Sequence, residues 1–255
     1  MINDILENKK EINDDNWFED WFDSEYYHIL YQDRDEAEAK AFLNMLMQKL
    51  QFKNHHTILD LACGRGRHTN YLASLGMNIT GYDLSASSIE YATETALHPV
   101  NFGVRDMREP FGDNEFDIIL NLFTSFGYFE NESENLQVMQ NISKALKPNG
   151  IVVIEYLNPD EVIKNLTARE SKHIEHISFE ISKSIKDSFI YKNIKFCHNG
   201  KNHNHTEKVM LIRKNQFENY FEISNLTLVN IFGDHQFHSY QQSTSPRMIL
   251  IAQKI

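Results

Sequence analysis

From residue 57 to residue 156, short apolar runs alternate with stretches in which apolar residues recur at helical spacing. Such runs have little polar alternation, which is typical of parallel strands buried on both faces of a sheet. Five strands are predicted in this part of the chain: TILDLA (57–62), NITGYD (78–83), VNFGV (100–104), FDIILNLF (116–123) and GIVVIEY (150–156).

The stretches between the runs carry the signals of helix starts and ends. Ser85 is a suitable cap for one of them, and Gly76 ends another. Alternation of strand and helix at this spacing predicts a doubly wound α/β fold with a mostly parallel, seven-stranded sheet. The helices are expected at 67–75, 85–97, 133–146 and 215–224, and the last two strands at 226–232 and 247–254.

Upstream of the sheet, two N-terminal helices are predicted, an aromatic one over residues 17–31 and an amphipathic one from Asp35 to Leu50. After residue 160, period-two apolar positions predict a small antiparallel sheet. Its strands are expected at 177–185, 188–196 and 207–214.

The polar stretch HNGKNHNHT, which precedes the last of these antiparallel strands, contains three histidines: His198, His203 and His205. Histidines in this number could bind a metal ion. Because they lie among Gly and Asn residues, we interpret the stretch as an exposed hairpin turn and expect no metal.

Charge and composition narrow the class of protein. The chain has 25 basic and 36 acidic side chains and a formal charge of -11, which would repel a nucleic-acid backbone. The acidic N-terminus does not look like a signal peptide, and no apolar window reaches a membrane-spanning length. The chain has only two cysteines, Cys63 and Cys197, which suits a reducing compartment. Together these features predict a cytoplasmic protein that binds neither nucleic acid nor membrane.

The stretch ILDLACGRGRHTNYLASLG contains a glycine turn between a strand and a helix, where α/β folds bind ligands. Gly64 and Gly66 match the first two glycines of the dinucleotide pattern, but Thr69 occupies the third position. About twenty residues later, Asp83 ends the second strand, where an acid can accept hydrogen bonds from both hydroxyls of a ribose. The pattern therefore favours a nucleoside without a pyrophosphate.

In this respect the sequence resembles the class I S-adenosylmethionine-dependent methyltransferases. The resemblance rests on LDLACGRG, GYDLS, the acid of VRDMRE and FDIILNLFTSFGYF, in that order and spacing. It implies S-adenosyl-L-methionine as cofactor and divides the chain into a helical lid (1–52), a cofactor-binding core (53–160 and 213–255) and an antiparallel insertion (161–212).

The resemblance also implies a role for each matching residue. Asp60 and the backbone of the next turn would lie under the methionine, Asp83 would bind the ribose, and the residues after the third strand would bind the adenine. The family often has Gly where this chain has Ala62, which should narrow the loop. The implied cofactor-binding residues are Asp60, Ala62, Cys63, Gly64, Asp83, Leu84, Asp106, Met107, Asn121 and Leu122, with Tyr27 or Tyr31 reaching over from the lid.

The acceptor side is less clearly marked. The fourth strand is followed by Asn121-Leu122-Phe123-Thr124, without the Pro-Pro-aromatic motif of enzymes that methylate nucleobase or amide nitrogens. FTSFGYF instead resembles family members acting on small molecules, including amino sugars and amines, so we expect a small-molecule N or O acceptor. Tyr128, and His235 or His238 as a base, are the candidate catalytic residues.

Several alternatives remain at this stage. The inserted sheet could be a wall or lid of the pocket or a dimer contact, and the protein could be a monomer or a homodimer. A non-catalytic nucleoside-binding or scaffold protein fits the same motifs. A nicotinamide-dependent reductase is disfavoured by Thr69.

Overall fold

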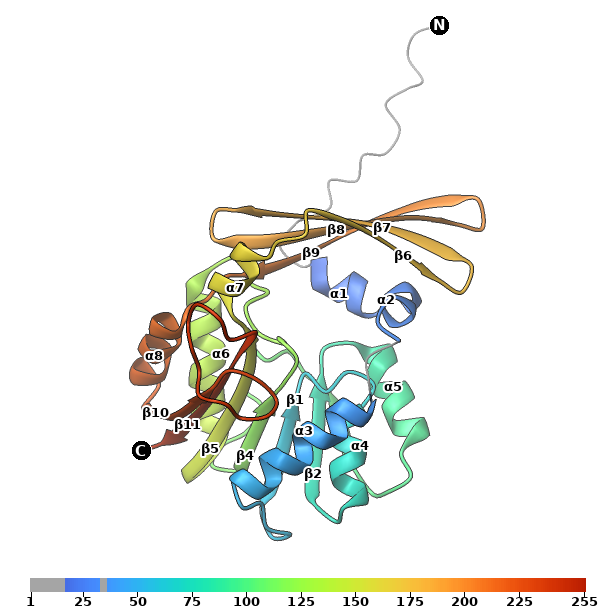
Figure 1. Ribbon diagram of the computed structural model, residues 1–255. Coiled ribbons are helices and arrows are strands. Elements are labelled where there is room, and N and C mark those ends of the chain that lie inside the picture. Colours follow the sequence, from blue (N-terminus) through green and yellow to red (C-terminus); the bar gives the residue numbers. More distant parts are fainter. Residues whose placement is uncertain (1–16, 33–35) are drawn as a thin grey trace, which may run out of the picture.

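The structure is a computed structural model that describes residues 17–32 and 36–255 (Figure 1). Residues 1–16 of the predicted lid and Asp35 of the predicted second helix lie outside the described residues. No helix of the described part is both long and apolar enough to cross a membrane.

The main sheet has seven strands in the order β10-β11-β5-β4-β1-β2-β3. The five strands β5, β4, β1, β2 and β3 are parallel to one another, whereas β11 runs antiparallel to both β5 and β10. The predicted doubly wound sheet is therefore confirmed, including a reversed strand near one edge. Its strands are β1 (Thr57–Leu61), β2 (Asn78–Asp83), β3 (Asn101–Val104), β4 (Phe116–Asn121), β5 (Leu146–Leu157), β10 (Leu226–Phe232) and β11 (Arg247–Lys254).

Helices cover both faces of this sheet (Figure 1). On one face, α3 and α4 bury apolar side chains such as Phe42 and Leu72 against β1 and β4. On the other face, α6 and α8 do the same with Met139 and Phe217. The helices of the main body are α3 (Glu36–Lys49), α4 (Arg67–Ser74), α5 (Ala86–Thr95), α6 (Glu132–Ala145) and α8 (Lys214–Ile223).

The order of the strands fixes where a ligand can bind. Strand β1 lies between β2 and β4. The chain adds β2 and β3 on one side of β1 and then crosses over to add β4 on its other side. Asp60 of β1 pairs with Gly81 and with Leu120, which brings the carboxyl ends of the three strands to one edge. Ligands of open α/β sheets bind at this kind of crevice.

A second, antiparallel sheet follows β5 and the short helix α7 (Pro159–Lys164), and it has four strands where three were predicted. Strand β6 was missed because RESKHI exposes nearly every side chain and has no apolar alternation. The strands are β6 (Arg169–Ile174), β7 (Ile177–Lys186), β8 (Phe189–His198) and β9 (Lys201–Met210).

The exposed hairpin turn expected over HNGKNHNHT is present but covers only residues 199–200, and the prediction was wrong for the rest of the stretch, because β9 starts at Lys201. His203 and His205 occupy half-buried positions of β9. The ring of His203 stacks on Phe196 at 4.6 Å, and that of His205 stacks on Trp21 at 4.3 Å. Asn residues at the outward positions give this strand its turn-like composition.

The predicted aromatic helix is broken in two, α1 (Trp17–Phe22) and α2 (Glu25–Leu30), because Ser24 caps the second helix. Both lie between the second sheet and the main sheet (Figure 1). On the second sheet, Glu207 accepts hydrogen bonds from Trp21 Nε1 (2.9 Å) and from the Tyr31 hydroxyl (2.6 Å) and pairs with Lys192 (3.4 Å).

At the main sheet, Asp23 provides the second anchor of these helices. Its carboxylate accepts hydrogen bonds from Ser85 Oγ (2.7 Å) and the backbone N–H of Ser87 (3.0 Å), at the start of α5. Hydrogen bonding by these serines lowers the pKa of Asp23. The helix pair is thus attached to both sheets through carboxylates.

We expect Glu207→Ala to loosen α1 and α2 from the second sheet. The substitution removes the acceptor of Trp21 and leaves Lys192 without its ion-pair partner, at a cost of about 1–3 kcal/mol. Both tryptophans of the chain, Trp17 and Trp21, lie in α1. Tryptophan emission should therefore shift to longer wavelength and become more accessible to acrylamide.

The matched control is Glu170→Ala, which breaks an ion pair of the same sheet, with Lys183 at 2.9 Å. It should leave tryptophan emission as in the wild type. Equal changes in both variants would show that Glu207 is not a specific anchor of the N-terminal helices.

Candidate functional site

The glycine turn that follows β1 is built from backbone conformations that few residues adopt. Ala62, Gly64 and Gly66 have φ values of 64°, 55° and 74°. A Cβ at Gly66 would lie 2.9 Å from the ring of Phe102, so both its conformation and its surroundings require glycine. Ala62 adopts the left-handed conformation at a cost of about 1–2 kcal/mol.

Cys63 lies inside this turn and fixes it to the neighbouring strand. Its N–H donates to the carbonyl of Tyr82 at 3.0 Å, and its side chain is buried. Burial raises the pKa of the thiol, so it stays neutral. Cys63 therefore contributes backbone geometry to the site and no thiolate.

Asp60 is buried beneath the turn, with 1 % of its surface exposed. Burial raises its pKa to about 6, although Thr69 Oγ1 donates a hydrogen bond to it at 2.6 Å. The charge of Asp83 raises the pKa further. Thr69, at the place of the third glycine in dinucleotide-binding proteins, is thus the hydrogen-bond donor that this carboxyl needs.

Asp83 ends β2 on the other side of the turn. Its carboxylate accepts hydrogen bonds from the N–H groups of Gly64 (2.7 Å) and Ser85 (2.9 Å). Burial raises its pKa, and these two donors only partly oppose the effect. Leu84 follows it, half-buried against the main core. The turn therefore has a carboxyl group on each side, and burial disfavours the charged form of both.

Among the residues predicted for the adenine, Asp106 already has a partner. Arg108 donates to it from its backbone N–H (2.8 Å) and from its guanidinium (2.7 Å) and also pairs with Glu134 (3.1 Å). Met107 is half-buried against the core, and its carbonyl accepts a hydrogen bond from Asn141 Nδ2. An adenine amino group would have to share Asp106 with Arg108, a partner that the sequence did not reveal.

Asn121 ends β4 and Leu122 follows it, and the two side chains differ in their surroundings. Asn121 Nδ2 donates to the carbonyls of Leu61 (3.0 Å) and Ser125 (3.1 Å), which links the glycine turn to the loop after β4. Its Oδ1 is buried and has no hydrogen-bond partner among the described residues. Leu122 packs into the core beneath α3 and α4.

The two lid tyrosines belong to the aromatic layer between the sheets. The ring of Tyr27 lies 5.0 Å from Phe22 and 4.9 Å from Tyr31, measured between ring centroids. The hydroxyl of Tyr31 bonds to Glu207. Tyr128 reaches the same layer from the loop after β4. Its ring lies 5.2 Å from Phe22, while its hydroxyl donates to the carbonyl of Thr124 at 2.5 Å.

His235 lies apart from this layer among charged side chains and is 7 % exposed, whereas its partner Glu38 is exposed. Its Nε2 is 2.8 Å from Glu155 Oε1, and its Nδ1 is 3.0 Å from Glu38 Oε1. Arg247 also contacts Glu155 Oε1, at 2.9 Å. His238, by contrast, is exposed and pairs with Asp234.

The pKa values of this cluster shift in the direction of an ion pair. Burial disfavours the charged imidazole of His235, but Glu155 and Glu38 outweigh it and raise the pKa. Burial likewise opposes the charge of Glu155, yet His235 and Arg247 lower its pKa. Glu155 was missed in the sequence, although a charged residue inside the apolar run GIVVIEY signals a buried partner.

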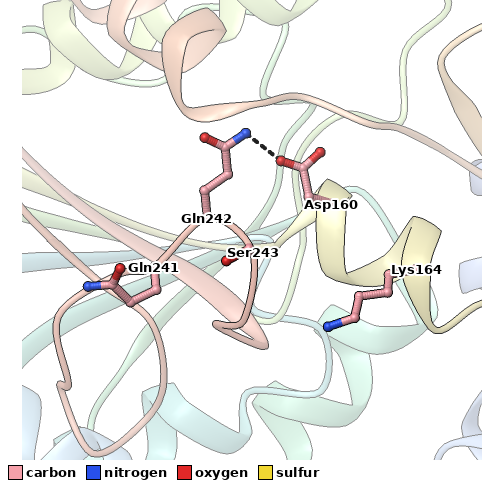
Figure 2. A pocket seen from close by; sticks show the side chains of 5 residues that line it. All are labelled: Asp160, Lys164, Gln241, Gln242 and Ser243. Carbon is pink, nitrogen blue, oxygen red and sulfur yellow. Dashed lines mark hydrogen bonds between the residues drawn. The ribbon is translucent and has the colours of Figure 1, made fainter.

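A pocket of about 550 Å³ opens between α7 and the loop before β11 (Figure 2). Its lining is polar, and Asp160 bonds there to Gln242 (2.5 Å) and to Arg213 (3.1 Å). None of the predicted site residues lines it, so we place no part of the predicted site there. The lining residues are Asp160, Lys164, Gln241, Gln242 and Ser243.

Comparison with solved structures shows the same fold in other proteins. The structure superposes on an S-adenosylmethionine-dependent methyltransferase from Clostridium acetobutylicum with a TM-score of 0.77 and 16 % identity, over 90 % of this chain and 96 % of that one. An amino pentose methyltransferase from Micromonospora echinaspora, with S-adenosylmethionine bound, gives 0.71 and 16 %, over 91 % and 98 %. Identities this low show a shared fold only.

Among curated relatives, glycine N-methyltransferase of Rattus norvegicus is 28 % identical over 176 residues, which cover 62 % of this chain and 58 % of the relative. Ubiquinone biosynthesis O-methyltransferase of Rickettsia bellii is 32 % identical over 126 residues, which cover 46 % and 50 %. The chain thus spans about half the length of these relatives.

The decisive match is to a family described as "Methyltransferase domain", and it covers residues 52–225. This range includes the glycine turn, both buried acids and the whole second sheet. The resemblance found in the sequence is confirmed, and the chain belongs to the methyltransferase domain family.

Proposed function

We propose that this protein is an S-adenosylmethionine-dependent methyltransferase that transfers a methyl group to a nitrogen or oxygen of a small molecule. One observation carries the proposal: Asp60 and Asp83, both with raised pKa values, lie on either side of one glycine turn. Buried carboxyl groups in such a pair favour a ligand that brings positive charge and hydroxyl donors.

The residues present fit this cofactor. S-adenosylmethionine has an ammonium group, a sulfonium and two ribose hydroxyls, which match two acids and the unpartnered Oδ1 of Asn121. The pyrophosphate of a nicotinamide cofactor would instead lie against the carboxyl group of Asp60, which is buried beneath the same turn. The electrostatics of the site therefore support a sulfonium nucleoside over a dinucleotide.

In this proposal the cofactor lies along the carboxyl ends of β1, β2 and β4. Asp60 and the backbone of the glycine turn hold the methionine, Asp83 holds the ribose, and the side chains after β3 hold the adenine. The proposed binding residues are Asp60, Ala62, Cys63, Gly64, Asp83, Leu84, Asp106, Met107, Asn121 and Leu122, with Tyr27 and Tyr31 above them.

When bound, S-adenosylmethionine supplies a methyl group on a positively charged sulfur. The remaining task of the chain is to align the acceptor and to exclude water. The aromatic layer of α1, α2 and Tyr128 suits this task, since Trp17, Phe18 and Trp21 are all buried. We assign α1 and α2 as the lid, because α3 of the predicted lid (1–52) packs with α4 against the main sheet. The second sheet is assigned as the outer wall of the pocket, and Tyr128 as an acceptor-side residue.

A small-molecule acceptor is supported by two observations. The formal charge of -11 disfavours nucleic acids, and the matching relatives are named for glycine, ubiquinone biosynthesis and an amino pentose. The names of the two curated relatives specify methylation of a nitrogen and of an oxygen, and they refer to chemically different compounds. The proposal therefore extends to the nucleophile and not to one compound.

Calorimetry with S-adenosylmethionine and S-adenosylhomocysteine tests the cofactor, and we expect binding of both. Incubation of a cell extract with the protein and methyl-labelled cofactor, followed by mass spectrometry, then shows which metabolite gains the label. Absence of heat with either ligand would refute the proposal. Binding without any labelled product would instead favour a non-catalytic nucleoside-binding protein.

We expect Asp83→Asn to weaken binding of S-adenosylhomocysteine by roughly thirtyfold, because a hydrogen bond to a charged group is worth about 2 kcal/mol. Asparagine keeps the size of the side chain but has one acceptor oxygen, which can serve the N–H of Gly64 or that of Ser85 and not both, since they bond to different oxygens of Asp83. Calorimetry measures the effect. The control Asp113→Asn, at an exposed acid, should bind as the wild type does.

We expect Asp60→Asn to stabilise the ligand-free protein while weakening its binding of S-adenosylhomocysteine. The carboxyl has a pKa of about 6 when folded and 3.8 when unfolded, so the unfolded chain binds fewer protons between these values. Stability of the wild type therefore falls as pH rises from about 4 to 6, by about 3 kcal/mol.

Urea denaturation at several pH values measures this difference. The variant should exceed the wild type in free energy of unfolding at pH 7, and the two should converge below about pH 3, where Asp60 is neutral in both states. A variant less stable than the wild type at pH 7 would show that burial of the Asp60 carboxylate does not destabilise the fold.

A further inference from the structure

We infer that Glu155 is a positioning residue for the loop of residues 122–128 and that His235 and Arg247 hold it in place. The inference rests on the proposed function, because this loop follows β4 and faces the acceptor side. Glu155 is fully buried near the end of β5, and both of its carboxylate oxygens are used.

The loop needs such a support because of its backbone. Phe123 and Thr124 are consecutive non-glycine residues with φ values of 59° and 62°. Each such conformation costs about 1–2 kcal/mol and persists only where the surroundings hold it. Glu155 accepts two hydrogen bonds from this segment: the N–H of Phe123 donates to its Oε2 and the N–H of Thr124 donates to its backbone carbonyl, both at 3.0 Å.

The same loop leads directly to the proposed site. The Tyr128 hydroxyl bonds to the carbonyl of Thr124, so the position of the tyrosine depends on that residue. Asn121 bonds to the carbonyls of both Ser125 and Leu61, and Leu61 precedes the glycine turn. A displacement at Phe123 and Thr124 would thus reach both Tyr128 and the turn.

His235 acts on this loop through Glu155. It faces Glu155 from β5, Glu38 from α3 and Arg247 from β11, and its ring packs on Phe42 at 4.6 Å. A protonated imidazole donates to both carboxylates, whereas a neutral imidazole donates to only one. Both nitrogens are occupied in this way, which favours a positioning role over that of a base for the acceptor.

Further charges lie across the ring of Phe123. The guanidinium of Arg67 lies 4.8 Å from the ring centroid, and His68 stacks on the ring at 5.0 Å. Arg247 lies 5.9 Å from the same ring. Two guanidinium groups therefore lie near the ring of Phe123, and Glu155 is the carboxylate that bonds to its N–H.

The pH dependence follows from the raised pKa of His235. Below the ordinary pKa of histidine the ion pairs with Glu155 and Glu38 are complete. They are lost as the pH rises through the raised pKa of the folded protein, because only then does the imidazole release its proton. The loop should accordingly be held more firmly at mildly acidic than at alkaline pH.

Hydrogen–deuterium exchange of the intact protein tests the inference, with rates corrected for the intrinsic effect of pH. In Glu155→Gln the amide cannot serve both sides, since its NH₂ must face either the Phe123 N–H or His235 and Arg247. We expect peptides covering residues 120–128 to exchange about tenfold faster, as for the loss of one hydrogen bond of about 1.4 kcal/mol.

His235→Gln should accelerate exchange of the same peptides and abolish the pH dependence seen in the wild type. Two controls match these variants. Asp117→Asn breaks an ion pair with Lys147 at the opposite ends of β4 and β5, and His238→Gln removes the exposed histidine of the same loop as His235. Both should leave exchange of residues 120–128 and its pH dependence unchanged.

Wild-type exchange of this loop in Glu155→Gln, or an equal effect of Asp117→Asn, would overturn the inference. Calorimetry with S-adenosylhomocysteine, run on the same proteins, separates it from the proposed function. Failure of the wild type to bind refutes the proposed function while the exchange data still decide the role of Glu155. Binding by the wild type with an unperturbed loop in the variants refutes the positioning role alone.

Discussion

The burial of two carboxyl groups at the ends of adjacent parallel strands is the constraint around which this structure is arranged. Asp60 and Asp83 keep their places because the glycine turn, Thr69 and the start of α5 supply hydrogen-bond donors to them. These donors compensate only part of the desolvation, as the raised pKa values show. The two carboxyl groups therefore favour a cationic partner at this edge of the sheet.

Most of the main sheet was predictable from the sequence, because buried parallel strands and their capped helices leave local patterns. The second sheet was only partly so. Strand β6 is largely exposed, and the first part of β9, before the predicted strand at 207–214, is rich in Asn and His, so neither stretch has the alternation that marks a strand. Their conformation depends on pairing with β7 and β8, which is a long-range interaction that a local pattern does not contain.

The candidate site shows the same division. The positions of Asp60, Asp83 and the glycines could be inferred from spacing, since the carboxyl ends of parallel strands meet at one edge. The partners of Asp106 and His235 could not, because Arg108 turns back on its own loop and Glu155 reaches across 80 residues of chain. Sequence spacing identifies a site, whereas the charge balance within it depends on tertiary contacts.

The double attachment of α1 and α2 has a thermodynamic consequence. Asp23 attaches them to the first turn of α5, beside Asp83, and Glu207 attaches them to the second sheet. Two sites that share one rigid element are linked, and linkage is reciprocal. The free energy by which the attachment at the second sheet favours the attachment at α5 equals the free energy of the reverse effect, so the two sheets are coupled through α1 and α2.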